Sequence, residues 1–264
     1  MNLSNLESEY VNVNGIRLHY LDWGGRGPTL IFLTGMGYSA YIFNKFAPRF
    51  TDKFHVLALT RRGQGDSESP ESGYDANTLI EDIRQFMDHL NVEKACLAGH
   101  SLAGVELTHF AATYSTRIEK LIYLDALDNR KGLIVIHQQD PLRNIEIIRE
   151  ESTPHTLEEY IACTKKDSPD IAEIWSELWD IEMSHQASAN DDGIFVERMP
   201  KAARKLLIEH LITRYTPKEV EAKIPTLSFY ALGIHKQSNI YTEEQKALFD
   251  QFFLNVRNPF YMSL

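Results

Sequence analysis

The first half of the chain alternates short apolar runs with amphipathic segments, and this rhythm constrains the fold more than any other feature. The segments 29–34, 55–60 and 95–98 are continuous apolar runs of strand length, typical of strands buried on both faces. Between the last two, residues 75–90 repeat apolar side chains at helical spacing. Strands joined by helices through short connections favour a parallel sheet covered on both faces. The sequence therefore predicts an α/β fold with a mostly parallel sheet.

Further elements extend this sheet. Two alternating segments, 10–13 and 16–23, flank Asn14-Gly15, a pair typical of a β-hairpin turn. We also expect a helix over 39–50, a helix over 102–114 directly after the third apolar run, and a strand over 120–124.

The rhythm changes after residue 125. We expect a discontinuous core of residues 1–125 and 223–264, with a helical cap inserted over 126–222. Within the cap the sequence favours helices and no buried strand. The predicted cap helices are 157–164, 171–184 and 201–214; the core then resumes with a strand over 226–232 and a helix from Thr242.

Charge and composition exclude several classes of partner. The formal net charge of −10 argues against nucleic acid or an anionic membrane surface, which need clustered Lys and Arg. No apolar run approaches the length of a membrane span, and the polar amino terminus lacks a signal-peptide pattern, so we expect a cytoplasmic protein. The two cysteines have no disulfide or metal-ligand spacing, and no nucleotide or flavin motif is present. We therefore expect no cofactor and no metal.

Ser101 is the strongest candidate for a reactive residue. The segment GHSLA at 99–103 joins the third apolar run directly to a helical segment. A serine on such a tight turn is forced into a strained backbone conformation, and its neighbours must be small. The turn lifts the hydroxyl clear of the sheet, and the next amide at the helix N-terminus can donate to a developing oxyanion. The alternative interpretation is a serine that merely caps an ordinary strand-to-helix turn.

In this context the chain resembles the α/β-hydrolase family over about residues 10–130. The G-x-S-x-G motif matches at 99–103, with Ala103 in place of the last glycine. The segment FLTGMG at 32–37 resembles the family's oxyanion loop, with Thr34 in place of the usual histidine. The resemblance implies a serine hydrolase of the esterase type, with Met36 and Leu102 supplying the oxyanion amides. The segment 60–67 resembles a D-x-R-G-x-G-x-S loop that we interpret as structural.

An orienting acid is expected after the sixth strand. A serine needs a general base, and that base needs an acid to orient it. In the family the acid usually follows the seventh strand, but residues 232–239 contain no Asp or Glu. Asp125 ends an apolar run, where a carboxylate is costly without a partner or a task. We therefore expect Asp125 to be the acid, with Asp128 as the alternative; a turn or helix-cap role for Asp125 is the structural interpretation.

The general base is the missing member of the set. The family's histidine follows an eighth strand, whereas this sequence ends at Leu264 and its last histidine is His235. The resemblance thus implies either that the final strand and its histidine are absent from this sequence, or that His235 has been recruited as the base. His100 flanks Ser101 and is expected to pack or line the site.

Three functional hypotheses follow. The first is a carboxylesterase-like serine hydrolase acting on a small-molecule acyl compound. Epoxide hydrolases and dehalogenases of the same fold resemble the chain less well, because they use an aspartate where Ser101 stands. The second is a catalytically inactive relative that binds a small molecule, and the third is a truncated hydrolase that lacks its catalytic histidine. The sequence does not select a substrate or an oligomeric state.

Overall fold

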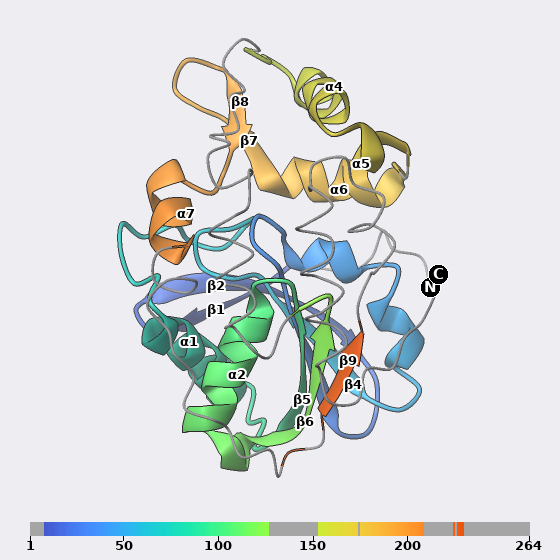
Figure 1. Ribbon diagram of the computed structural model, residues 1–264, viewed down its shortest axis with the longest axis vertical. Helices are drawn as coiled ribbons and strands as arrows, with labels where there is room; N and C mark the ends of the chain where they lie inside the picture. Colours follow the sequence, from blue (N-terminus) through green and yellow to red (C-terminus); the bar gives the residue numbers. More distant parts are fainter. Residues whose placement is uncertain (1–7, 127–152, 174, 209–223, 225, 230–264) are drawn as a thin grey trace, which may run out of the picture.

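A seven-stranded sheet lies at the centre of the computed structural model, which describes residues 8–126, 153–173, 175–208, 224 and 226–229 (Figure 1). Its strand order is β1-β2-β4-β3-β5-β6-β9. The strands are β1 (Glu9–Val13), β2 (Ile16–Gly24), β3 (Thr29–Leu33), β4 (His55–Leu59), β5 (Ala95–His100), β6 (Ile118–Leu124) and β9 (Thr226–Phe229).

From β4 to β9 in this order the neighbouring strands pair in parallel, and within this sheet the β1–β2 and β2–β4 pairs are antiparallel. This confirms the predicted mostly parallel α/β sheet. The three apolar runs form β3, β4 and β5, and nearly all of their side chains are buried. Burial on both faces explains why these strands show no alternation of polar and apolar residues.

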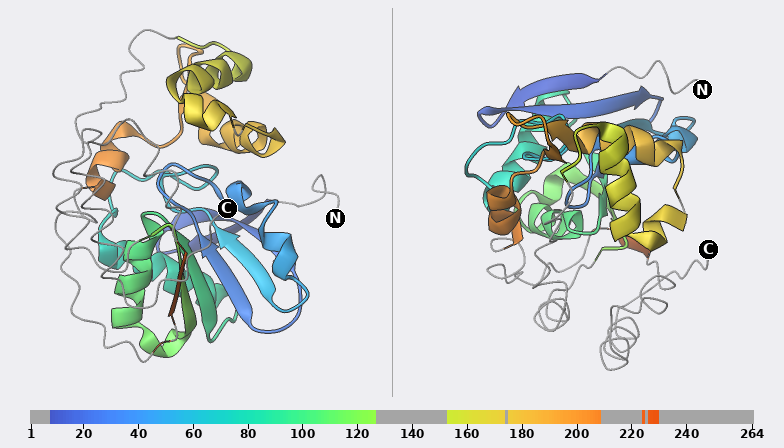
Figure 2. Two further views of the ribbon diagram at one scale, coloured as in Figure 1. Left: turned by 45° about the vertical axis from the view of Figure 1, so that its right-hand side comes forward. Right: turned by 90° about the horizontal axis from the view of Figure 1, so that it is seen from above.

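Helical layers cover both faces of the sheet (Figures 1 and 2). On one face α1 (Ala76–His89) and α2 (Ala103–Thr113) enclose the larger apolar cluster. On the other, η2 (Ala40–Phe43) and η3 (Ala47–Phe50) enclose a second cluster around Phe32. The prediction of one helix over 39–50 was wrong. Pro48 has no N–H to donate and its ring clashes with the preceding turn, so the segment divides into two short 3-10 helices.

A second group of elements, here called the upper lobe, lies beyond the end of the sheet toward which the β6 arrow points (Figure 1), and its helix Glu177–Gln186 contacts η2. It comprises α4 (Leu157–Asp167), α5 (Pro169–Glu173), α6 (Glu177–Gln186), β7 (Ala187–Ala189), β8 (Phe195–Glu197) and α7 (Lys201–Ile208).

Two predictions for this lobe need correction. The helix expected over 171–184 is divided into α5 and α6, because Ser176 adopts an extended conformation (φ −150°) that ends one helix before the other begins. The short antiparallel hairpin of β7 and β8 was not predicted. Its strands are only three residues long and mostly not buried, so they leave no apolar run in the sequence.

Other expectations lie partly outside the described residues. The helix expected over 201–214 is seen to residue 208, and the strand expected over 226–232 is seen to residue 229. The helix expected from Thr242 lies outside the described residues, and the cap boundaries stay a prediction. In the described part of the chain, no helix combines the length and apolar character needed to cross a membrane.

Candidate active site

Ser101 lies in the tight turn between β5 and α2 with a left-handed backbone conformation, φ 51°. Its side chain is exposed, although the strand before it is buried. Gly99 shows why the turn needs small residues. A Cβ at this position would lie 2.8 Å from Leu107 Cδ1 and 3.1 Å from the backbone carbon of Ala103. The local geometry therefore matches the strained, exposed serine expected from the sequence.

Asp125 holds a second left-handed conformation, φ 45°, directly after β6. The amide of Ser101 donates a hydrogen bond to the carbonyl of Leu124 at 3.1 Å, so the two residues follow the ends of neighbouring strands. Left-handed residues other than glycine are uncommon and concentrate at functional sites when the surrounding structure enforces them. Asp125 is thus placed near Ser101 by the sheet itself.

The loop after β3 lies directly beside Ser101. A Cβ on Gly35 would lie 3.3 Å from Ser101 Cβ and 2.7 Å from His100 Nδ1, so a side chain at this position would displace the His100 ring. Among the described residues, the backbone N–H groups of Met36 and Leu102 have no hydrogen-bond partner. The side chains of both residues pack into one apolar cluster with α7. The fold therefore brings the side chains of the two predicted oxyanion residues into one cluster near the Ser101 turn.

His100 lies directly before Ser101 and beside Gly35 of the loop after β3. Burial lowers the pKa of His100, and the nearby Asp125 carboxylate only partly opposes the shift. Its ring lies 5.9 Å from the ring of Tyr38, which in turn lies 6.0 Å from Trp179 of the upper lobe. Within the described segments no hydrogen bond joins His100 to Ser101. The predicted base His235 and the alternative acid Asp128 lie outside the described residues.

Two buried ion pairs support the loop that follows β4. Arg61 Nε donates to Glu106 Oε1 at 2.5 Å, and Arg62 donates to both carboxylate oxygens of Asp82 at 2.6 Å. Ser67 Oγ donates to the carbonyl of Thr60 at 2.7 Å and closes the loop. These contacts agree with the structural interpretation of residues 60–67. The described residues contain no group of three or more His, Cys, Asp or Glu side chains that could hold a metal.

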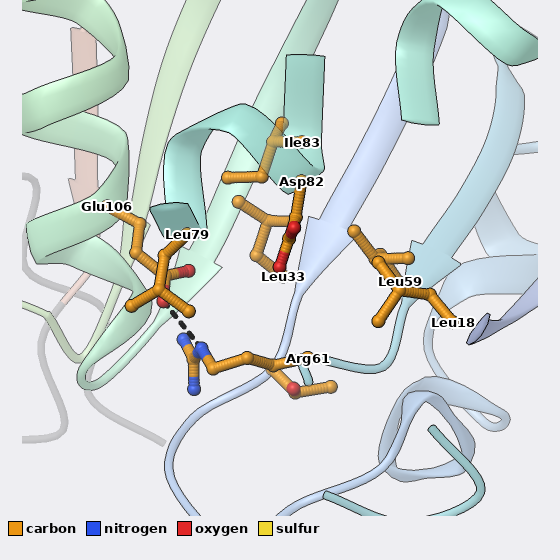
Figure 3. A pocket seen from close by; sticks show the side chains of 9 residues that line it. Leu18, Leu33, Leu59, Arg61, Leu79, Asp82, Ile83 and Glu106 are labelled. Carbon is orange, nitrogen blue, oxygen red and sulfur yellow. Dashed lines mark hydrogen bonds and ion pairs between the residues drawn. The ribbon is translucent and has the colours of Figure 1, made fainter. Parts of the chain in front are cut away.

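A small cavity lies between the sheet and the helices α1 and α2 (Figure 3). About 10 Å³ is open to the centre of a water molecule, and the walls include Leu33, Thr34 and the Arg61–Glu106 pair. In the described structure Thr34 Oγ1 and the two terminal nitrogens of Arg61 have no hydrogen-bond partner. Such a volume admits about one water molecule. The cavity is therefore too small for an organic substrate, and Ser101 is not among the residues that line it.

Sequence reasoning missed the contacts that attach the upper lobe to the sheet domain. Asp66 accepts hydrogen bonds from His185 Nδ1 at 2.5 Å and from Arg198 at 2.6 Å. The ring of His185 also stacks on that of Tyr41, with centroids 3.8 Å apart. Asp66 stands in a glycine-rich loop and His185 in a polar helix, so neither carries a local signal. Only the fold shows that residues more than a hundred positions apart are partners.

Comparison with known proteins identifies the family. A family model described as the alpha/beta hydrolase fold matches residues 28–166, which is more than half of the chain. The chain belongs to this family. The match confirms the resemblance noted in the sequence and the predicted fold class.

Two curated relatives illustrate the range of chemistry in the family. A soluble epoxide hydrolase of Corynebacterium sp. (strain C12) is 35% identical over 130 residues, covering 49% of this chain and 44% of that protein. A 2-(acetamidomethylene)succinate hydrolase of Mesorhizobium japonicum (strain LMG 29417 / CECT 9101 / MAFF 303099) is 31% identical over 118 residues, covering 45% of this chain and 42% of that protein. The chain thus matches less than half the length of these relatives.

The solved structures agree on the fold. The crystal structure of E-2-(acetamidomethylene)succinate hydrolase superposes with a TM-score of 0.69 at 22% identity, covering 85% of this chain and 80% of that chain. At this identity the likeness concerns the fold alone.

Proposed function

We propose that this chain is a serine hydrolase that cleaves an ester or related acyl compound through Ser101. The observation that carries the proposal is the exposed Ser101 at φ 51°, beside a glycine-bounded loop and two backbone amides without partners in the described structure. Relatives in the family are hydrolases, which supports a hydrolytic reaction.

In the proposed mechanism Ser101 Oγ attacks the substrate carbonyl carbon while its proton passes to a histidine base. The amides of Met36 and Leu102 donate to the resulting oxyanion, since they flank Ser101 on the loop after β3 and at the start of α2. The tetrahedral intermediate then releases the leaving group, which takes the proton from the base, and an acyl-enzyme forms. Water hydrolyses this ester by the same steps.

Asp125 is the proposed acid that orients the base, and His235 is the candidate base within the given sequence. Position supports Asp125, because its backbone follows β6 and neighbours Ser101 through the hydrogen bond to Leu124. A small-molecule acyl substrate and a cytoplasmic location are part of the same proposal.

Labelling of the chain with a fluorophosphonate tests the proposal. The Oγ–phosphorus bond forms as the phosphorus–fluorine bond breaks, and the hydroxyl proton passes to the base. We expect labelling of the wild type, none of Ser101→Ala, and a rate at least about 10³-fold lower in Asp125→Asn. His235→Ala should abolish labelling if that residue is the base. The matched control Asp22→Asn, at a half-exposed carboxylate of β2, should label normally.

Two outcomes would contradict the proposal. Folded wild type that does not label would favour the inactive, ligand-binding interpretation, and labelling that persists in Ser101→Ala would place the nucleophile elsewhere. Assays with p-nitrophenyl acetate and styrene oxide separate ester from epoxide chemistry. We expect turnover of the ester alone, because epoxide hydrolases of this fold resemble the chain less well at the nucleophile position.

A further inference from the structure

Glu182 is a buried carboxylate of the upper lobe that the proposed mechanism does not use. It lies on α6, and its side chain is completely buried. A buried carboxylate is costly unless donors surround it. Three hydrogen-bond donors surround the Glu182 carboxylate. Oε1 accepts from the amide of Ser39 at 2.6 Å and from Gln186 Nε2 at 2.8 Å, and Oε2 accepts from Ser39 Oγ at 2.7 Å.

Each hydrogen bond that the Glu182 carboxylate makes with the described residues comes from a donor group. Burial raises the pKa of Glu182, and the hydrogen bonds from Ser39 and Gln186 oppose that shift. All three partners are donors in this arrangement, so the ionised carboxylate satisfies them. A glutamine in its place would direct its NH₂ group at the Ser39 hydroxyl, which would have to turn from donor to acceptor while it also accepts from the amide of Tyr41.

Ser39 ends the loop that carries Met36. This loop leaves β3 at Leu33 and is fixed at two points beyond Met36. Gln64 Oε1 accepts a hydrogen bond from the amide of Gly37, and Glu182 holds Ser39 by both its amide and its hydroxyl. Gln64 follows β4 of the central sheet, whereas Glu182 belongs to α6 of the upper lobe.

We infer that Glu182 is a positioning residue that aims the Met36 amide at the oxyanion through Ser39. This inference rests on the proposed function, because it assigns the Met36 amide to the oxyanion hole. Docking of α6 onto the sheet domain thereby completes the hole. Preorganised donors contribute most when their geometry is held fixed before reaction, so a loosened loop should slow the chemical step more than it weakens binding.

The test compares Glu182→Gln with Glu182→Asp and with Asp180→Asn. Asp180 is exposed on the same helix and accepts from Trp175 Nε1, so it controls for loss of a carboxylate from α6. With fluorophosphonate and p-nitrophenyl acetate, Glu182→Gln should lower the maximal rate at least about tenfold with little change in KM or inhibitor affinity. Glu182→Asp should recover part of the rate, and Asp180→Asn should match the wild type.

Hydrogen exchange provides a readout independent of activity. In Glu182→Gln the amides of residues 34–41 should exchange faster than in the wild type, while those of β5 stay protected. A folded Glu182→Gln protein with normal rates, or with unchanged exchange in this loop, would overturn the inference. Wild-type protein that does not label contradicts the proposed function itself, and the exchange result then shows separately whether Glu182 orders the loop.

Discussion

At Ser101 the backbone conformation carries an energetic cost that glycine would avoid. Its φ of 51° is unfavourable for any side chain with a Cβ. We therefore expect Ser101→Gly to be more stable than Ser101→Ala by about 0.5–1 kcal/mol, measured by urea unfolding. Ser168, with φ −133°, is the matched control, and there the glycine variant should be the less stable one. If the glycine variant were less stable than the alanine variant at both positions, backbone strain at Ser101 would be contradicted.

His19 makes a further prediction at the residue scale. It is completely buried, its Nδ1 lies 2.8 Å from Thr60 Oγ1, and its ring stacks on Tyr41. Burial lowers the pKa of His19 from 6.5 to about 4, with Asp66 opposing the shift. Between about pH 4 and 6.5, His19 is protonated in the unfolded chain but neutral in the folded protein. The free energy of unfolding therefore falls as the pH falls through this range.

The expected loss from His19 is about 2 kcal/mol between about pH 7 and about pH 4.5. Urea unfolding at both pH values should show this loss in the wild type, and a correspondingly smaller pH dependence in His19→Gln. His89→Gln, at an exposed position on α1, should keep the wild-type dependence. If stability depended equally on pH in all three proteins, the loss of stability in acid could not be assigned to His19.

At the scale of elements, the ion pair between Arg61 and Glu106 joins the end of β4 to α2. Both side chains are about 5% exposed or less, so neither charge can be removed alone without leaving the other buried. We expect Glu106→Gln to lower the free energy of unfolding by about 3–5 kcal/mol. Replacing both partners, with Arg61→Met and Glu106→Leu together, should recover much of this loss because no buried charge remains.

The control for this comparison of single and double variants is the solvent-accessible ion pair of Arg84 and Asp88 on α1. Asp88 also pairs with Arg117, and Asp88→Asn, which removes both of these solvent-accessible pairs, should still lower the free energy of unfolding by only about 1 kcal/mol. A double variant as unstable as Glu106→Gln would show that packing, rather than the unpaired charge, dominates at this site.

At the scale of the whole molecule, Asp66 attaches the upper lobe to the sheet domain. Burial alone would raise the pKa of Asp66, but the hydrogen bond and charge of His185, together with the neighbouring Arg198 guanidinium, lower it overall. A lowered pKa means that the attachment is present at neutral pH and weakens as pH falls toward the acidic range. The lobe should therefore loosen in acid before the sheet unfolds.

Asp66→Asn tests this attachment. The variant should expose residues 154–199 to limited proteolysis and raise their hydrogen exchange at neutral pH, while β3, β4 and β5 stay protected. The matched control Asp22→Asn removes a carboxylate that pairs with His55 on the sheet, away from the lobe. Unchanged exchange of the lobe in Asp66→Asn would show that its apolar contacts alone hold it.

The sequence by itself determined the sheet and the chemical character of one turn. Continuous apolar runs have to be buried on both faces, which fixed β3, β4 and β5, and the pattern at 99–103 indicated the exposed serine. Asn14-Gly15 likewise fixed the first hairpin, where both residues have positive φ. These features are local, because spacing and turn chemistry within a few residues decide them.

Only the tertiary structure decided which polar residues become partners. The contacts of Glu182 with Ser39, and of Asp66 with His185 and Arg198, join segments more than a hundred residues apart. A buried carboxylate and an exposed one look alike in a sequence, since burial depends on what packs over them. The short hairpin of the upper lobe likewise left no apolar pattern in the sequence, whereas the division of 39–50 follows from Pro48, a local signal that the sequence did contain. Long-range contacts therefore determine how the loop beside Ser101 is held, and residue patterns do not encode them locally.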